Sequence, residues 1–250
     1  MNITRILQEA ILPGRILAVQ VGLTRTAVLA EAEDGIRCGL AATLANPEFE
    51  HPHQPAVHCA GHLQEMDCTE LAALVESTSY TETSIGLAAI NALLPRKPEL
   101  WVDLNAEDYL IQNCAGKNVA IIGHFPFINR LKPHVKNLWV LELNPRDGDL
   151  PAQAAPEFVP QADFVAITGT TLINKTFDGL IPLCRPGATV VMLGPSTPLS
   201  PILFDFGISI VSSTIVDDPQ ATALGVAQGI SLQQLRQTGC VRFVTMQRER

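Results

Sequence analysis

The C-terminal part of the sequence alternates short apolar runs with segments of helical or turn character. Short, nearly continuous apolar runs are typical of parallel strands that are buried on both faces. The runs are residues 119–123, 138–143, 164–168, 189–194 and 208–216. Helical segments are expected at 172–184, 201–206 and 219–228, with a candidate edge strand at 241–246. This alternation predicts a doubly wound, Rossmann-like parallel sheet.

The N-terminal part has a different organisation. Helices are expected at 2–12, 67–75 and 83–93, strands at 15–22, 24–31 and 36–43, and a loop at 46–62. Prolines 95 and 98 and the polar residues 103–105 indicate a boundary. We therefore expect an α/β protein with a small α+β domain at 1–104 and a Rossmann-like domain at 105–250.

A polar, turn-like segment begins the last predicted stretch of the N-terminal part, at about 79–93, and a helix follows it. Thr81 or Thr83 can serve as its N-cap, which places Glu82 at the positive end of the helix dipole. Asn91 is an amide among small and apolar residues. Two interpretations stay open: Asn91 bonds to a neighbouring loop of the core, or Glu82 and Asn91 face a cleft. A buried carboxylate in such a cleft would need a partner or a ligand.

Polar and small residues follow four of the predicted strands. Because ligands bind beyond the carboxyl ends of parallel strands, these segments are expected to converge on one rim. The candidate ligand-binding residues there are Gly123, His124, Phe125, Glu142, Gly169, Thr170, Thr171, Gly194, Pro195, Ser196 and Thr197. Each also has a plain structural interpretation, as a turn glycine, a helix cap or a rim histidine. Their convergence favours a ligand site more than any single residue does.

A dinucleotide site receives only partial support from this rim. Glu142 lies at the end of the second strand, where an acidic residue commonly binds ribose hydroxyls. The sequence has neither a G-x-G-x-x-G fingerprint nor a Walker motif. The bulky residues and the proline after Gly123 occupy the place where a pyrophosphate needs bare backbone. A small anion or carboxylate bound by Ser196, Thr197 and the following helix N-terminus is a further option.

Composition excludes several classes of partner. A net charge of -8, no basic run and an aromatic content of 5% disfavour nucleic acid as a main partner. No run reaches the length of a membrane-spanning helix, and the N-terminus lacks a signal-peptide pattern. Six scattered cysteines do not form a disulfide framework. We expect a soluble cytoplasmic protein with reduced thiols and, as a default, a homodimer.

The loop at 46–62 contains five potential metal ligands: His51, His53, His58, Cys59 and His62. His58 and His62 have a metal-binding spacing only if they lie on a helix. Pro52 and Pro55 argue against such a helix, so a solvated loop is the simpler interpretation.

Several motifs together resemble the putative heavy-metal chelation family of prokaryotes. They are 82–91 around Glu82 and Asn91, Gly123 with Phe125-Pro126, 148–151, 168–176 and 193–198. The resemblance covers nearly the whole chain. It implies a domain similar to the enolase N-terminal domain joined to a Rossmann-like domain, with a site in the crevice between them.

Three functional hypotheses follow. In the first, a small molecule or metal chelate binds between the domains, for chelation or for a step in making a chelator or metallo-cofactor. Glu82, Asn91, His124, Asp149, Thr170, Asn174, Ser196 and Thr197 would form the site, with Glu82 and His124 as its catalytic candidates. A divalent transition metal suits these donors. In the second, an enzyme uses S-adenosylmethionine, with Glu142 on the ribose and His124 as general base. The third is a metabolite sensor or storage protein that binds without turnover.

Overall fold

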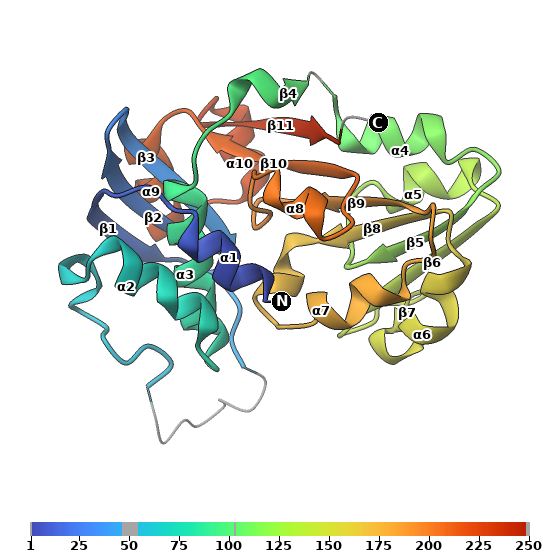
Figure 1. Cartoon of the computed structure of the whole chain (residues 1–250), viewed down its shortest axis with the longest axis horizontal. Helices are drawn as coiled ribbons and strands as arrows, with labels where there is room; N and C mark the ends of the chain where they lie inside the picture. The colour runs from blue at the N-terminus through green and yellow to red at the C-terminus, as the bar shows by residue number, and fades with distance from the viewer. Residues whose placement is uncertain (1, 47–54, 103, 249–250) are drawn as a thin grey trace.

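The computed structural model describes residues 2–46, 55–102 and 104–248. Its N-terminal unit contains a three-stranded antiparallel sheet in the order β1-β2-β3. The strands are β1 (Arg15–Val21), β2 (Arg25–Ala32) and β3 (Gly35–Ala42). The helices of this unit are α1 (Ile3–Glu9), α2 (Cys68–Ala73) and α3 (Tyr80–Leu93), with a 3-10 turn, η2 (Leu74–Glu76), after α2. The predicted antiparallel meander is thereby confirmed (Figure 1).

Helix α3 is buried over nearly its whole surface, between the small sheet and the α2–η2 segment. Two glycines permit this packing. A Cβ at Gly39 of β3 would lie 2.1 Å from the Ala88 carbonyl oxygen, and one at Gly86 would lie 2.1 Å from the Val75 amide nitrogen. The N-cap is Ser79, whose hydroxyl accepts from the Glu82 amide, so the expected cap at Thr81 or Thr83 is wrong. Both threonines instead lie within the first turn.

The C-terminal unit is built on an eight-stranded sheet in the order β4-β11-β10-β9-β8-β5-β6-β7. The six strands from β10 to β7 in this order pair in parallel with one another, whereas β11 is antiparallel to both β10 and β4. The strands are β4 (Trp101–Val102), β5 (Asn118–Ile122), β6 (Asn137–Glu142), β7 (Leu150–Pro151), β8 (Phe164–Thr168), β9 (Thr189–Leu193), β10 (Ile210–Val216) and β11 (Val241–Gln247). The predicted α/β class with a Rossmann-like parallel sheet is confirmed.

Helices cover both faces of this sheet, which explains why its strands are apolar at successive positions. In β5, Val119 and Ile121 pack with α4 (Ala106–Asn113) and α5 (Ile128–Leu131). Ala120 and Ile122 belong instead to the core formed with α6 (Ala155–Phe158), α7 (Phe177–Leu180) and α8 (Ile202–Asp205). Helices α9 (Pro219–Ala227) and α10 (Leu232–Gln237) cover the second face of the small sheet.

Two local expectations need correction. Strand β11 matches the predicted strand at 241–246 but is not an edge, because β4 lies outside it. The helix expected at 172–184 is broken into 3-10 turns and the short α7. The break lies at Lys175, whose backbone is left-handed with φ of 61° and so cannot continue an α-helix.

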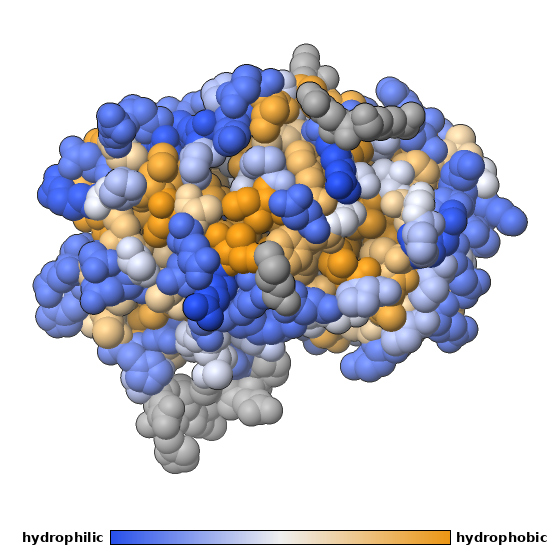
Figure 2. Space-filling view, viewed as in Figure 1, coloured by the Kyte–Doolittle hydropathy of each residue, from blue (hydrophilic) through white to orange (hydrophobic). Residues whose placement is uncertain are grey.

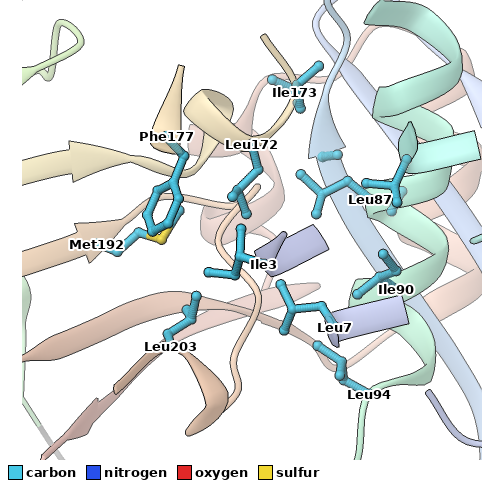
Figure 3. Close-up of a cluster of buried hydrophobic side chains, with 14 of the residues drawn as sticks. Ile3, Leu7, Leu87, Ile90, Leu94, Leu172, Ile173, Phe177, Met192 and Leu203 are labelled. Atoms are coloured by element: carbon cyan, nitrogen blue, oxygen red, sulfur yellow. The ribbon is translucent and has the colours of Figure 1, made fainter. Parts of the chain in front are cut away.

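One hydrophobic core joins the two units. Ile3 and Leu7 of α1 lie between Leu87 and Ile90 of α3 and a group from the large sheet and its loops (Figure 3). That group includes Leu172, Phe177, Met192 and Leu203. On the face seen in Figure 2, hydrophobic residues also gather near the centre, between hydrophilic margins. Across the described residues, no helix is both long enough and apolar enough to cross a bilayer.

The contact between α3 and η2 gives the first prediction. Gly86→Ala should lower the free energy of unfolding by about 3 kcal/mol, because the new Cβ meets backbone that has no room to move. Gly179→Ala in α7 is the control, since its Cβ would meet nothing within 4 Å, and it should change stability by less than about 1 kcal/mol. Urea unfolding of both variants measures the difference. Equal stability of the two would contradict the described packing.

Candidate functional site

A cavity of about 690 Å³ opens beyond the carboxyl ends of β5, β6 and β8. The chain order reverses between β5 and β8, because β6 and β7 extend the sheet on one side and β9 and β10 on the other. Such a topological switch point is where open α/β sheets bind ligands. Its polar lining residues are His124, Glu142, Gln153, Thr168, Thr170, Thr171, Asn174, Lys175 and Thr176. Apolar walls come from residues such as Ile122, Phe125, Leu141, Leu180 and Leu183.

Gly123 shapes the entrance to this cavity at the end of β5. Its φ of 103° is left-handed, and a Cβ there would lie 2.9 Å from the Thr168 Cγ2 atom. A side chain would therefore be disfavoured both by the backbone and by β8. Phe125 follows in the cavity wall and stacks on Phe127, with ring centroids 5.2 Å apart.

His124 forms a pair with Asp149. Their Nδ1 and Oδ2 atoms are 3.1 Å apart, and the Asp149 oxygen also accepts from the Arg146 amide, at 3.1 Å. The Asp149 side chain is only 4% exposed, whereas the His124 ring is 26% exposed. An Nδ1–H donated to the carboxylate leaves Nε2 as the ring nitrogen available to a ligand. The structure thus brings together two predicted residues that are 25 positions apart.

Glu142 and the threonines form opposite parts of the lining. Glu142 ends β6, and its Oε2 accepts from the Leu143 amide at 3.0 Å. Beyond β8, the Thr170 hydroxyl lies 3.1 Å from that of Thr168, and Thr171 donates to the Thr168 carbonyl at 2.8 Å. Asn174 also lines the cavity. The rim predicted from these three strand ends is therefore one continuous surface.

The fourth predicted segment lies elsewhere. Gly194, Pro195, Ser196 and Thr197 do not line this cavity. Ser196 and Thr197 are buried, and Ser196 Oγ accepts from the Ala42 amide of β3 at 2.8 Å. Gly169 permits the close approach, because a Cβ there would lie 2.5 Å from the Thr197 amide nitrogen. This loop thus connects the two units behind the wall of the cavity.

Glu82 also lies apart from the cavity lining. Its carboxylate accepts from the His58 amide at 2.8 Å, contacts the His58 ring at 2.9 Å and accepts from the Ser77 hydroxyl at 2.5 Å. Burial alone would raise the pKa of Glu82, but these hydrogen bonds outweigh it and hold the pKa below its ordinary value. Its predicted catalytic role stays a prediction.

The interpretation that Asn91 bonds to a neighbouring part of the core holds in part. Its amide nitrogen donates to the Leu40 carbonyl of β3 at 2.8 Å, which ties α3 to the small sheet. Asn91 does not line the cavity.

Lys175 lines the cavity but was not among the site residues predicted from the sequence. It is exposed and lies in the loop after β8, and its ammonium donates to the Val75 carbonyl of η2. The available signal was its place in the motif at 168–176, four residues after Thr171, although a helix was expected over 172–184.

Metal ligands are sparse in the described parts of the chain. Within residues 2–46, 55–102 and 104–248, no group of three or more His, Cys, Asp and Glu side chains could hold a metal ion. His58 and His62 are not on one α-helix, since 58–61 form turns before a 3-10 helix at Leu63–Glu65. His51 and His53 lie outside the described residues.

The fold and site define a Rossmann-like protein with an open cavity at the switch point, joined to a small α+β unit. Residues 105–245 match the model of the DUF364 family and residues 4–94 that of DUF4213, both described as putative heavy-metal chelation. The chain therefore belongs to this putative heavy-metal chelation family.

Solved structures and a sequence relative agree with this assignment. A DUF364 protein of unknown function from Desulfitobacterium hafniense is 27% identical, with a TM-score of 0.83 and 98% of each chain covered. One from Pyrococcus horikoshii is 20% identical, with a TM-score of 0.82, covering 99% of this chain and 98% of that one, and shows the shared fold. An uncharacterized protein of Methanocaldococcus jannaschii is 26% identical over 82% of this chain and 80% of its own length.

The contacts of Glu82 give the second prediction. A carboxylate with a depressed folded-state pKa stabilises the fold fully above its unfolded value, here 4.5, and loses this contribution as the pH falls through the folded-state pKa. Glu82→Gln should therefore cost about 1–2 kcal/mol near neutral pH, and the difference from the wild type should shrink below pH 4.5. Urea unfolding across this range measures both.

Glu65→Gln is the matched control, because among the described residues the Glu65 side chain pairs only with His62, and both are exposed. It should change stability by less than about 0.5 kcal/mol at any pH. A pH-independent cost for Glu82→Gln would contradict a stabilising role of the ionised carboxylate.

Proposed function

We propose that the switch-point cavity binds a small organic metal chelate, in which His124 completes the coordination of the ion. The observation that carries this proposal is that His124, which lines the cavity, is paired through Nδ1 with the buried carboxylate of Asp149. A carboxylate that accepts from one ring nitrogen fixes the tautomer of a metal-binding histidine and raises the basicity of the other nitrogen. The family description supports a role in heavy-metal chelation.

The donor set determines which form of metal would fit. Structural zinc sites use four protein ligands and catalytic sites three. The cavity lining offers one imidazole, His124, and one carboxylate, Glu142. This set does not fit a resident ion held by protein side chains alone, but it does fit an ion that arrives with most of its ligands. Imidazole nitrogen suits nickel, zinc and copper, and the size of the cavity suits a metabolite-sized ligand.

The remaining lining residues would bind the organic part of the ligand. The hydroxyls of Thr170 and Thr176 and the amides of Gln153 and Asn174 can donate to or accept from polar groups. Leu141, Leu180 and Leu183 offer apolar contact area. Such a mixture of apolar walls and a few polar groups is typical of metabolite sites.

A second candidate function rests on Glu142. An acidic residue at the end of the second strand is where Rossmann proteins bind ribose hydroxyls, and Glu142 lines the cavity there. A nucleoside cofactor without a pyrophosphate, such as S-adenosylmethionine, needs no glycine-rich loop. If this function holds, S-adenosylmethionine should raise the melting temperature of the wild type, and Glu142→Gln should abolish the shift.

Calorimetric titration with Ni²⁺–iminodiacetate tests the first proposal, since this chelate leaves coordination positions open to imidazole. His124→Gln should weaken binding by about 100-fold, and Asp149→Asn by about tenfold, because Asp149 acts through the orientation of His124. His134→Gln is the control, since His134 is exposed and lies outside the cavity. Wild-type affinity in His124→Gln, or no binding by the wild type, would overturn the proposal.

A further inference from the structure

Lys175 lies at the border between the cavity and the N-terminal unit. It lines both the 690 Å³ cavity and an adjoining hollow of about 50 Å³ formed with Asn2, Ile3 and Thr4. Its ammonium crosses to the other unit and donates to the carbonyl of Val75. An ammonium has three donors, and the described residues provide it with one acceptor. Donors are therefore left for a ligand.

The backbone at Lys175 is held in an unusual conformation. Among the described residues, it is the only non-glycine residue with a positive φ, of 61°. The preceding Asn174 side chain accepts from the Thr176 amide at 3.2 Å and from the Thr176 hydroxyl at 2.7 Å, which fixes the turn. Such strain costs free energy and is found most often where a side chain must be presented in one place.

The charges around the cavity are divided between its two sides. Lys175 is the only Lys or Arg among the lining residues and follows β8. Glu142 ends β6, and His124, which is paired with Asp149, follows β5. Strand β5 separates β6 from β8. Desolvation lowers the pKa of Lys175 below its ordinary value, and the nearby Glu76 and Asp178 carboxylates oppose this by favouring the charged form. A ligand that satisfies both sides is acidic at one end and metal-binding or basic at the other.

We propose that Lys175 binds a carboxylate of the ligand, so that the chelate in this cavity is an amino-carboxylate. This inference rests on the proposed function and names the ligand class. Its amine nitrogen and the ion lie toward His124, and its acidic group lies toward Lys175.

A carboxylate fits this side better than a phosphate. Phosphate sites usually combine a lysine with a nest of backbone N–H groups at a glycine-rich loop. The loop after β8, which carries Lys175, uses its amides internally: those of Ile173 and Asn174 donate to the Thr170 carbonyl, and that of Thr176 donates to the Thr171 carbonyl. One ammonium without such a nest matches a singly charged group.

Two nickel chelates test the inference. Ni²⁺–iminodiacetate carries carboxylates, whereas Ni²⁺–ethylenediamine carries none. Lys175→Met keeps the aliphatic stem and should weaken binding of the first chelate by about tenfold or more, since hydrogen bonds to charged groups are the strong ones. Binding of the second should not weaken, because this chelate has no carboxylate and is a cation that the lysine repels. Lys175→Arg, which keeps the charge, should restore most of the affinity for the carboxylate chelate.

Ser196→Ala is the control for stability, because it removes a different hydrogen bond between the two units without touching the cavity. The melting temperature of each variant is measured first. The titrations are then run at a temperature below all of these melting temperatures, so that every variant is folded. The control should bind both chelates as the wild type does.

The outcomes separate the two proposals. Equal losses for both chelates in Lys175→Met, or no loss for either, would overturn the role of Lys175 while leaving that of His124 intact. A third outcome is that metal-free iminodiacetate binds as well as its nickel complex and that this binding is lost in Lys175→Met. That result would support the role of Lys175 and overturn the metal proposal. If neither chelate nor the free acid binds the wild type, both proposals fail.

Discussion

The backbone contacts of α3 constrain the rest of the molecule. Gly39 and Gly86 place this helix against β3 on one side and η2 on the other, at distances where a single Cβ would meet main-chain atoms. A helix enclosed in this way has no face exposed to water. Its polar side chains therefore need hydrogen-bond partners within the protein, and these lie near the ends of the helix. Ser79 and Glu82 do so in the first turn, and Asn91 does so with the Leu40 carbonyl. The same contact positions η2, whose Val75 carbonyl accepts from Lys175.

The core shared by the two units then fixes the walls of the cavity. Ile3 and Leu7 pack against Leu172 and Phe177, which flank the loop that carries Asn174 and Lys175. The loop at 194–197 is held by Ser196 on β3 and packs against Gly169. Loops are usually the mobile part of a Rossmann site. Here the packing of the N-terminal unit restrains two of them, so that unit acts as support for a site formed mostly by the C-terminal unit.

The sequence predicted most of the fold and part of the site, for identifiable reasons. Apolar runs buried on both faces reveal parallel strands, and strand ends reveal the rim, so Gly123, His124, Glu142 and Thr170 were placed at the cavity. Ser196 and Thr197 also follow a strand, but periodicity cannot show that another unit packs over them. The prediction of one helix over 172–184 was wrong because the backbone at Lys175 is left-handed. That conformation depends on a local contact of the Asn174 side chain, which leaves no periodic pattern in the sequence. The pairing of His124 with Asp149 depends on loop geometry alone.

The order of the strands explains how a single rim can carry separated charges. In a parallel sheet all carboxyl ends lie at one edge, so the distance between two loops across that edge is set by how many strands lie between them. Neighbouring strands are about 4.8 Å apart, and β6 and β8 are separated by β5, which places their ends about 10 Å apart. Glu142 follows one and Lys175 lies beyond the other. At this spacing the two charged side chains leave room for a ligand between them, with His124 at the end of the middle strand. The reversal of chain order at β5 and β8 thus creates both the cavity and its polarity.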